Sequence, residues 1–282
     1  AMGVFGAGVA SADVVSLSPT KDNTMYEYAA MAGDLSNGIG AHIFAGNNGN
    51  GEARRALVAF DLAAVPPGSR VLMVTLRMTM TMSNAGDIPI SLHRMAGNWG
   101  EGTSDASGQE GGGAVAKPGD ATWRHSNFPG TLWGTQGGDF APAASATLRV
   151  GGVGSYTWCS TDGLVADVQA WVNAPTTNFG WVAIGDESVP VTAKRFDSVQ
   201  SPAPANWPVL TVSFSPPPSV CGSSDFDSDG DSGTDLDIEA FFACLGGSCC
   251  CTCGSADFDG DGDTGTDLDI EAFFAVLGGG TC

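Results

Sequence analysis

The sequence has few basic residues. It contains 11 Lys and Arg against 31 Asp and Glu, and only 15% of its 282 residues are charged. Nucleic acids and anionic membrane surfaces are bound through clustered Lys and Arg that displace counterions, and the sequence has no such cluster. The formal net charge of −20 therefore argues against nucleic acid and favours cations as partners.

Long apolar runs are also missing, because no stretch reaches the roughly 18 residues that a membrane span needs. The beginning of the chain carries an export signature instead. Residues 1–9 are small and apolar, and Ala10-Ser11-Ala12 before Asp13 has the A-x-A form of a signal peptidase site. We expect a secreted, extracellular protein in which residues 1–12 are a signal-peptide remnant or an apolar extension of the mature chain.

Catalytic motifs are missing as well. The three histidines, His42, His93 and His125, share no metal-ligand spacing, and no G-x-S-x-G elbow is present. Nothing in the sequence brings two of the scattered acidic residues together as a glycosidase pair. We therefore expect a protein that is not an enzyme.

Charge and cysteine are concentrated at one end of the chain. Residues 221–282 hold 14 of the 31 acidic side chains, none of the 11 basic ones and seven of the eight cysteines. A run of three prolines before this tail favours a stiff, extended linker. The sequence thus predicts a body at 13–215, a linker at 216–220 and a tail at 221–282.

The body is dominated by strand patterns. Apolar residues alternate with polar ones from Val74 to Met82 and again from Leu210 to Phe214, which is typical of strands with one buried face. Residues 55–60 and 181–184 are expected to be more fully buried strands. Only Leu164 to Val172 has helical spacing, and Pro175 ends it. These elements predict a mainly β fold, an antiparallel β-sandwich or jelly roll.

Several motifs of the body resemble a known family, the DNRLRE-type domain, which is similar to jelly-roll carbohydrate-binding modules. The motifs include Asp22-Asn23-Thr24, the run from Arg54 to Leu62, Trp99-Gly100-Glu101 and Asn178-Phe179-Gly180-Trp181. The resemblance covers about residues 20–215 and implies a jelly-roll fold, a non-catalytic role and a place in a secreted or cell-surface bacterial protein. It does not imply a particular ligand.

The segment 95–147 shows no regular pattern but is rich in glycine and aromatic residues. One interpretation is a glycan platform, on which Trp99, Trp123 and Trp133 stack against sugar rings. The favoured alternative is that these aromatic side chains fasten a long loop to the sandwich and form a small core of their own.

The tail contains a duplicated motif. The segment from Cys221 to Ala243 recurs 32 residues later, from Cys253 to Ala275, and each copy has the form D-x-D-x-D-G followed by an apolar helical pattern. Carboxylates at alternate positions can wrap one hard cation, and the glycine allows the sharp turn between them. The tail is therefore predicted to bind two Ca²⁺.

This duplication resembles a dockerin module, a small α-helical calcium-binding domain. The resemblance places one ligand set at Asp225, Asp227, Asp229 and Asp237 and the other at Asp257, Asp259, Asp261 and Asp269, assisted by the carbonyls of Asp231 and Asp263. Counting from Asp225 puts Leu236 at the twelfth position, where a carboxylate is expected. Asp235 and Asp267 are therefore rival ligands, or N-caps of the helices.

Seven cysteines in so small a tail favour disulfides over zinc. Repeat symmetry pairs Cys221 with Cys250 and Cys253 with Cys282. Three tail cysteines remain and cannot all pair with one another: Cys244, Cys249 and Cys251. We therefore expect Cys159, the one cysteine of the body, to be joined to the tail.

Two functions fit these features. In the first, which we favour, the protein is an extracellular structural or adhesive subunit that assembles with other copies. Residues 1–17 would add as a strand to the next copy, head to tail, and build a filament, because water-exposed apolar residues need a covering surface. The side chains concerned are Met2, Val4, Phe5 and Val9. The same segment folded back as an edge strand of its own domain is the alternative.

In the second function, the protein is a glycan-binding module that recognises polysaccharide. Its dockerin-like tail would attach it to a scaffold protein on the cell surface.

Overall fold

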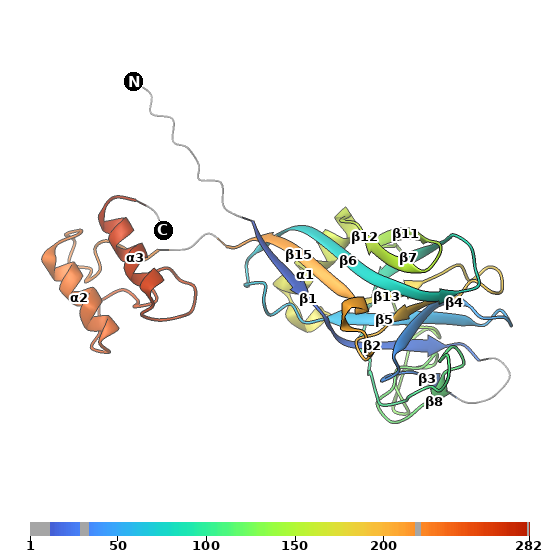
Figure 1. Cartoon of the computed structure of the whole chain (residues 1–282). Coiled ribbons are helices and arrows are strands. Elements are labelled where there is room, and N and C mark those ends of the chain that lie inside the picture. Colours follow the sequence, from blue (N-terminus) through green and yellow to red (C-terminus); the bar gives the residue numbers. More distant parts are fainter. Residues whose placement is uncertain (1–11, 29–33, 218–220, 281) are drawn as a thin grey trace, which may run out of the picture. The chain divides into compact units, whose positions relative to one another are not determined.

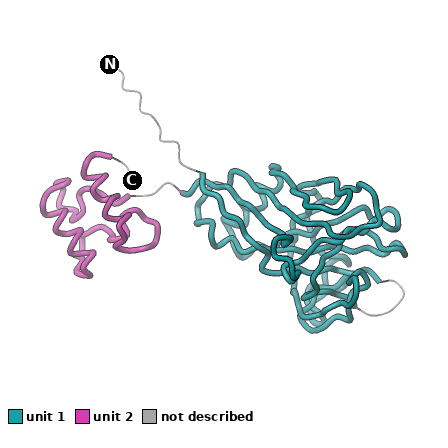
Figure 2. The backbone as a smooth tube through the Cα atoms, in the orientation of Figure 1, with its two compact units in different colours: residues 1–216 teal, residues 217–282 magenta. Residues whose placement is uncertain are grey.

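The computed structural model describes residues 12–28, 34–217, 221–280 and 282. The chain forms two compact units, residues 1–216 and residues 217–282, which we call the body and the tail (Figure 2). The division falls within the run of prolines.

The body is a curled, antiparallel sheet of eleven strands (Figure 1). Its strands are β1 (Asp13–Leu17), β2 (Pro19–Tyr26), β4 (His42–Asn47), β5 (Ala53–Phe60), β6 (Arg70–Ser83), β7 (Ile88–Arg94), β11 (Ala146–Val150), β12 (Gly154–Trp158), β13 (Trp181–Ile184), β14 (Lys194–Asp197) and β15 (Val209–Ser215). Their order is β1-β15-β6-β14-β4-β5-β13-β7-β11, while β12 pairs with β6 and β2 pairs with β5. The prediction of a mainly β, antiparallel body is confirmed.

Short elements complete the body. Two small ladders join β3 (Leu35–Ser36) to β8 (Ala114–Val115) and β9 (His125–Asn127) to β10 (Thr131–Leu132). Two single 3-10 turns lie at Pro175–Thr177 and Pro204–Asn206.

Strand β6 shows how the sequence sets the main core. Val74, Leu76, Met78 and Met80 are fully buried, as their alternation predicts, whereas Met82 is 39% exposed. Because β6 is long, β15 and β14 pair with successive parts of it. The buried side chains of β6 join those of β15, β5, β13 and helix α1 (Asp162–Asn173) in one hydrophobic cluster.

Helix α1 closes this core. The Thr161 hydroxyl accepts a hydrogen bond from the Leu164 N–H and caps the first turn, and the helix ends before Pro175. Leu164, Val168 and Trp171 face inward, which confirms the helix predicted from their spacing.

The N-terminal segment differs from the favoured prediction. Residues Asp13–Leu17 form β1, which pairs with β15 of the same chain as an edge strand. The alternation of this segment suits the edge of its own sheet, so its residues from Asp13 onward have folded back rather than entered another copy. The assembly residues Met2, Val4, Phe5 and Val9 lie outside the described residues.

The long segment 95–147 packs on the outer face of β2, β5 and β13 and forms a second hydrophobic cluster there. Trp99 and Trp133 are 3% and 7% exposed, and each indole N–H donates to a backbone carbonyl, of Phe179 and Thr122 respectively. Trp123 is half-buried, with the Arg55 guanidinium 4.7 Å above its ring. Trp99 and Trp133 are therefore core residues of this loop, as the favoured alternative expects, and Trp123 packs against them half-buried. Glycan binding by these rings stays a prediction.

The tail consists of two helices, α2 (Asp235–Leu245) and α3 (Asp267–Leu277), each preceded by a loop (Figure 1). The two repeats share one core. The Phe241 and Phe273 rings stack with centroids 4.1 Å apart, and the Phe226 and Phe258 rings stack at 6.2 Å. The Gly222 N–H donates to Phe258 O, and the Gly254 N–H donates to Phe226 O. Both ring pairs join equivalent positions of the two repeats, and the two hydrogen bonds are related to each other by the same repeat symmetry.

None of the helices in the described part of the chain combines the length and the hydropathy of a membrane span.

Candidate metal centres

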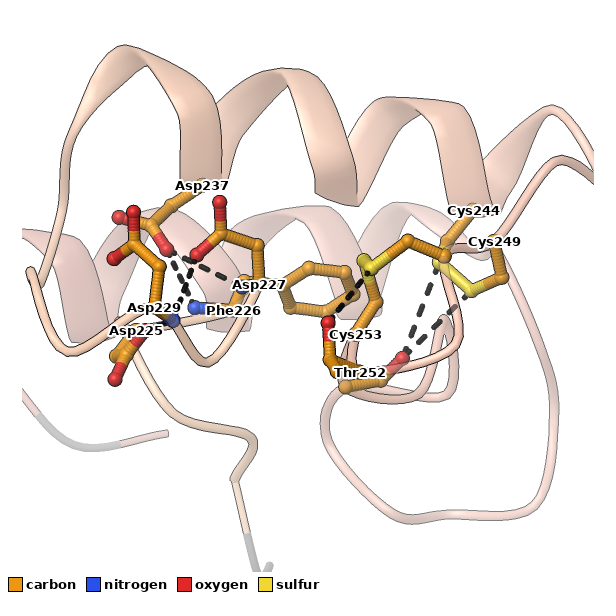
Figure 3. Close-up of a disulfide and its surroundings, with 11 residues drawn as sticks. Asp225, Phe226, Asp227, Asp229, Asp237, Cys244, Cys249, Thr252 and Cys253 are labelled. Carbon is orange, nitrogen blue, oxygen red and sulfur yellow. Dashed lines mark hydrogen bonds between the residues drawn. A yellow bond between two sulfur atoms is a disulfide. The ribbon is translucent and has the colours of Figure 1, made fainter.

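Each tail loop brings three aspartates together. One side-chain oxygen from each of Asp225, Asp227 and Asp229 lies within 4.8 Å of the other two, and the equivalent oxygens of Asp257, Asp259 and Asp261 do the same. Figure 3 shows the first group converging beside Phe226. Such a cluster of carboxylate oxygens can hold a metal ion.

The backbone of each loop is shaped around these carboxylates. The N–H groups of Asp229 and Gly230 donate to Asp225 at 3.1 and 3.2 Å, and the Asp231 N–H donates to Asp229 at 2.9 Å. Gly230 has φ 100° and Gly262 has φ 96°, a left-handed conformation that favours glycine. The Gly of each D-x-D-x-D-G motif is therefore required by the turn that folds the chain back over the site.

Asp237 and Asp269 fasten the loops to the helices. Both oxygens of Asp237 are in use, since Oδ1 accepts from the N–H groups of Phe226 and Asp227 and Oδ2 accepts from the N–H and hydroxyl of Thr234. Asp269 repeats the arrangement with Thr266 and Phe258. These residues form capping boxes at the helix starts and support the loops from behind.

The pKa values differ in direction between the capping aspartates and the clustered aspartates of the loops. Burial alone would raise the pKa of Asp237, but the hydrogen bonds from Thr234, Phe226 and Asp227 hold it below the ordinary value. By contrast, desolvation and the negative charges of Asp229, Asp237 and Asp225 raise the pKa of Asp227. Asp227 stands in a field of uncompensated negative charge, which a bound cation would relieve.

The donor set fits a hard cation. All six clustered ligands are carboxylates, and Asp257 Oδ1 is buried without a hydrogen-bond partner, as expected of an oxygen reserved for a metal. Asp231, Asp263 and the rival ligands Asp235 and Asp267 are exposed, and the carboxylates of these four lie outside the two groups. The structure therefore assembles three of the four carboxylates in each predicted set and uses the fourth as a capping residue.

The disulfides differ from the predicted pairs. The structure joins Cys221 to Cys282 and Cys250 to Cys253, and it also joins Cys244 to Cys249. The predicted pairs, Cys221 with Cys250 and Cys253 with Cys282, lay within single repeats. The first two observed pairs obey the same repeat symmetry but run between repeats, because the shared core sets the start of each repeat beside the end of the other. The pair of Cys244 and Cys249 lies within the first repeat and has no counterpart in the second.

Cys159 carries no disulfide and is exposed, as is Cys251. Three bridges account for six of the seven tail cysteines. The bond from Cys159 to the tail stays a prediction.

An apolar surface on the tail was missed by sequence reasoning. Phe242 and Phe274 are 45% and 47% exposed with ring centroids 6.3 Å apart, and Leu236 and Leu268 are 57% and 58% exposed. The rings of Phe242 and Phe274 lie side by side, and we call these two residues the apolar patch. The two adjacent Phe residues in each repeat could have predicted it, since only one of two adjacent helical residues can face the core and the other is left exposed.

Comparison with known protein families gives no match, and comparison with curated proteins gives none either. The resemblances to DNRLRE-type domains and to dockerins thus rest on the motifs of this chain.

Proposed function

We propose that the protein is a non-catalytic, extracellular bacterial protein whose tail folds around two Ca²⁺ and attaches it to a partner protein on the cell surface. The observation that carries this proposal is the apolar patch. Isolated exposed apolar residues are ordinary, but two exposed phenylalanine rings in contact on so small a module favour a protein interface, and Leu236 and Leu268 are exposed as well.

Charge favours a partner other than a second tail. The tail has 14 acidic and no basic side chains, so two tails repel each other even after two Ca²⁺ have bound to each. A partner with an apolar pocket and a basic rim complements both the patch and its surroundings. Head-to-tail assembly through residues 1–12 stays a prediction about the segment outside the described residues.

Calcium binding is the first part to test, by titrating the full chain after clearing metal with EGTA. We expect two sites, of which Asp227→Ala removes one and Asp259→Ala the other. Titrations that show no site, or sites that both variants leave intact, would contradict the proposal.

Attachment is tested by binding of the labelled protein to cell envelopes of the producing bacterium. Binding should require Ca²⁺ and should fall at least tenfold in Phe242→Ser/Phe274→Ser, which removes exposed side chains and leaves both calcium sites occupied. The matched control is Val153→Ser, because Val153 is 73% exposed on the body. Equal binding by the double variant and the control, with or without EGTA, would refute the role of the patch.

A further inference from the structure

A second group of oxygen atoms lies in the body, away from the tail loops. Asp22 of β2 is fully buried, and its backbone N–H donates to Glu101 Oε1 at 3.1 Å. The Gln200 amide donates to the same Glu101 oxygen at 2.9 Å, and the Val199 N–H donates to Asp22 Oδ2 at 2.8 Å. These bonds link Asp22, Glu101 and Gln200 in a closed ring, which we call the Asp22 cluster.

The Asp22 cluster has more acceptors than donors. Asp22 Oδ1 and Gln200 Oε1 are both buried without a hydrogen-bond partner. Gln200 cannot resolve this by turning its amide, because its nitrogen is held by Glu101. The nearby cation is also engaged, since Lys21 Nζ donates to Trp99 O and to Asn98 Oδ1. An unsatisfied buried acceptor loses its hydrogen bonds to water without replacement, so two in one ring call for a ligand.

The same feature occurs at a site where the chain already points to a metal. Asp257 Oδ1, in the second tail loop, is likewise buried and unpartnered. Two carboxylates and an amide oxygen are hard ligands of the kind that Ca²⁺ prefers. We propose that the Asp22 cluster is a third cation site, in which Asp22 Oδ1, Gln200 Oε1 and the Glu101 carboxylate ligate Ca²⁺.

Such an ion would join three distant parts of the chain: strand β2, the long segment after β7 and the turn after β14. A proton is the competitor for the same place. Burial and the Glu101 charge, opposed by the Val199 N–H, raise the pKa of Asp22 to about 7. A protonated Asp22 would carry an O–H donor and one negative charge fewer, so the ring would no longer need a metal. The two possibilities therefore predict different results.

Terbium, which takes the same oxygen ligands as calcium, separates this site from the tail. All seven tryptophans lie in the body, and the tail has no Trp or Tyr. Trp99 is two residues from Glu101, and the Trp207 indole donates to Ser201 O, next to Gln200. Terbium emission sensitised by tryptophan therefore reports an ion bound near the tryptophans of the body, and the variant Asp227→Ala/Asp259→Ala removes any contribution from the tail loops.

We expect saturable, tryptophan-sensitised emission from the full chain that excess Ca²⁺ displaces and that Asp227→Ala/Asp259→Ala leaves unchanged. Asp22→Asn and Gln200→Met should each weaken terbium binding at least tenfold, whereas Asp162→Asn, at an exposed position of the body, should not. Asp22→Asn keeps an acceptor for the Val199 N–H and removes a buried negative charge, so its fold should be retained.

Thermal unfolding provides a second readout. In the Asp227→Ala/Asp259→Ala background, Ca²⁺ should raise the melting temperature of the body, and adding Asp22→Asn should abolish that rise. Absence of emission from the unaltered chain would overturn the proposal in favour of the protonated ring. Emission that persists in both Asp22→Asn and Gln200→Met would overturn it in favour of binding elsewhere. Neither result bears on calcium binding by the tail.

Discussion

The disulfide pattern of the tail makes a quantitative prediction. A disulfide stabilises mainly by restricting the unfolded chain, and its contribution grows with the logarithm of the loop it closes. The separation of 61 residues between Cys221 and Cys282 gives about 4 kcal/mol. The separation of 3 between Cys250 and Cys253 gives about 2 kcal/mol. Replacing the first pair by serine should therefore cost the tail about twice as much stability as replacing the second.

The assay is hydrogen–deuterium exchange of peptides from α2 and α3 in saturating Ca²⁺, because the tail has no tryptophan to report its unfolding. Cys221→Ser/Cys282→Ser is compared with Cys250→Ser/Cys253→Ser, with the unaltered chain as reference. The alternative bridges within single repeats, Cys221 to Cys250 and Cys253 to Cys282, would close loops of equal length and contribute equally to the stability of the tail. Equal losses in the two variants, or peptide mapping that finds Cys221 bonded to Cys250, would refute the pairing between repeats.

Two further predictions concern single residues. Gly262→Ala places a side chain at a residue with φ 96°, which costs about 1–2 kcal/mol. Calcium binding by the second loop should therefore weaken about 5- to 30-fold, whereas the control Ser232→Ala, in the first loop, should not change it. An unchanged calcium affinity in Gly262→Ala would contradict the strained turn. Burial alone would raise the pKa of Asp34, but hydrogen bonds from Arg124 and Thr122 and nearby positive charge hold it below 3.8. A carboxyl group whose pKa is lower in the folded than in the unfolded state stabilises the fold at any pH above its unfolded-state pKa. This stabilisation is lost as the pH falls through its folded-state pKa. Asp34→Asn should therefore lower stability by about 1 kcal/mol at neutral pH, with the difference from the unaltered chain vanishing in acid; a constant difference in thermal melts would contradict the assignment.

The regular elements of the body could be predicted because the apolar residues that recur at strand or helix spacing in the sequence are the residues whose side chains are buried. In β6 every second side chain from Val74 to Met80 enters the core, and in α1 the spacing of Leu164, Val168 and Trp171 matches one helix face. Both patterns are written in consecutive residues. The aspartates of each metal centre were predictable for the same reason, since Asp225, Asp227 and Asp229 are neighbours in sequence.

Features that depend on distant residues were not predictable. Repeat symmetry is satisfied equally by bridges within and between repeats, and only the packing of Phe226 on Phe258 decides between them. The role of Asp237 depends on which backbone N–H groups meet it once the loop has closed. The Asp22 cluster gives no sequence signal. Asp22 and Glu101 are 79 residues apart, Glu101 and Gln200 are 99 residues apart, and they meet only in the folded sheet.

The bond between Cys221 and Cys282 also changes the topology of the tail. It joins the first tail cysteine to the last residue of the sequence, so the tail is a covalently closed ring. A protease that cuts once between these two cysteines opens the ring but releases no fragment, and both repeats stay tethered to their shared core. A tail that binds a partner as we propose would therefore keep its contacts after a single cleavage, which would be an advantage in surroundings that contain proteases.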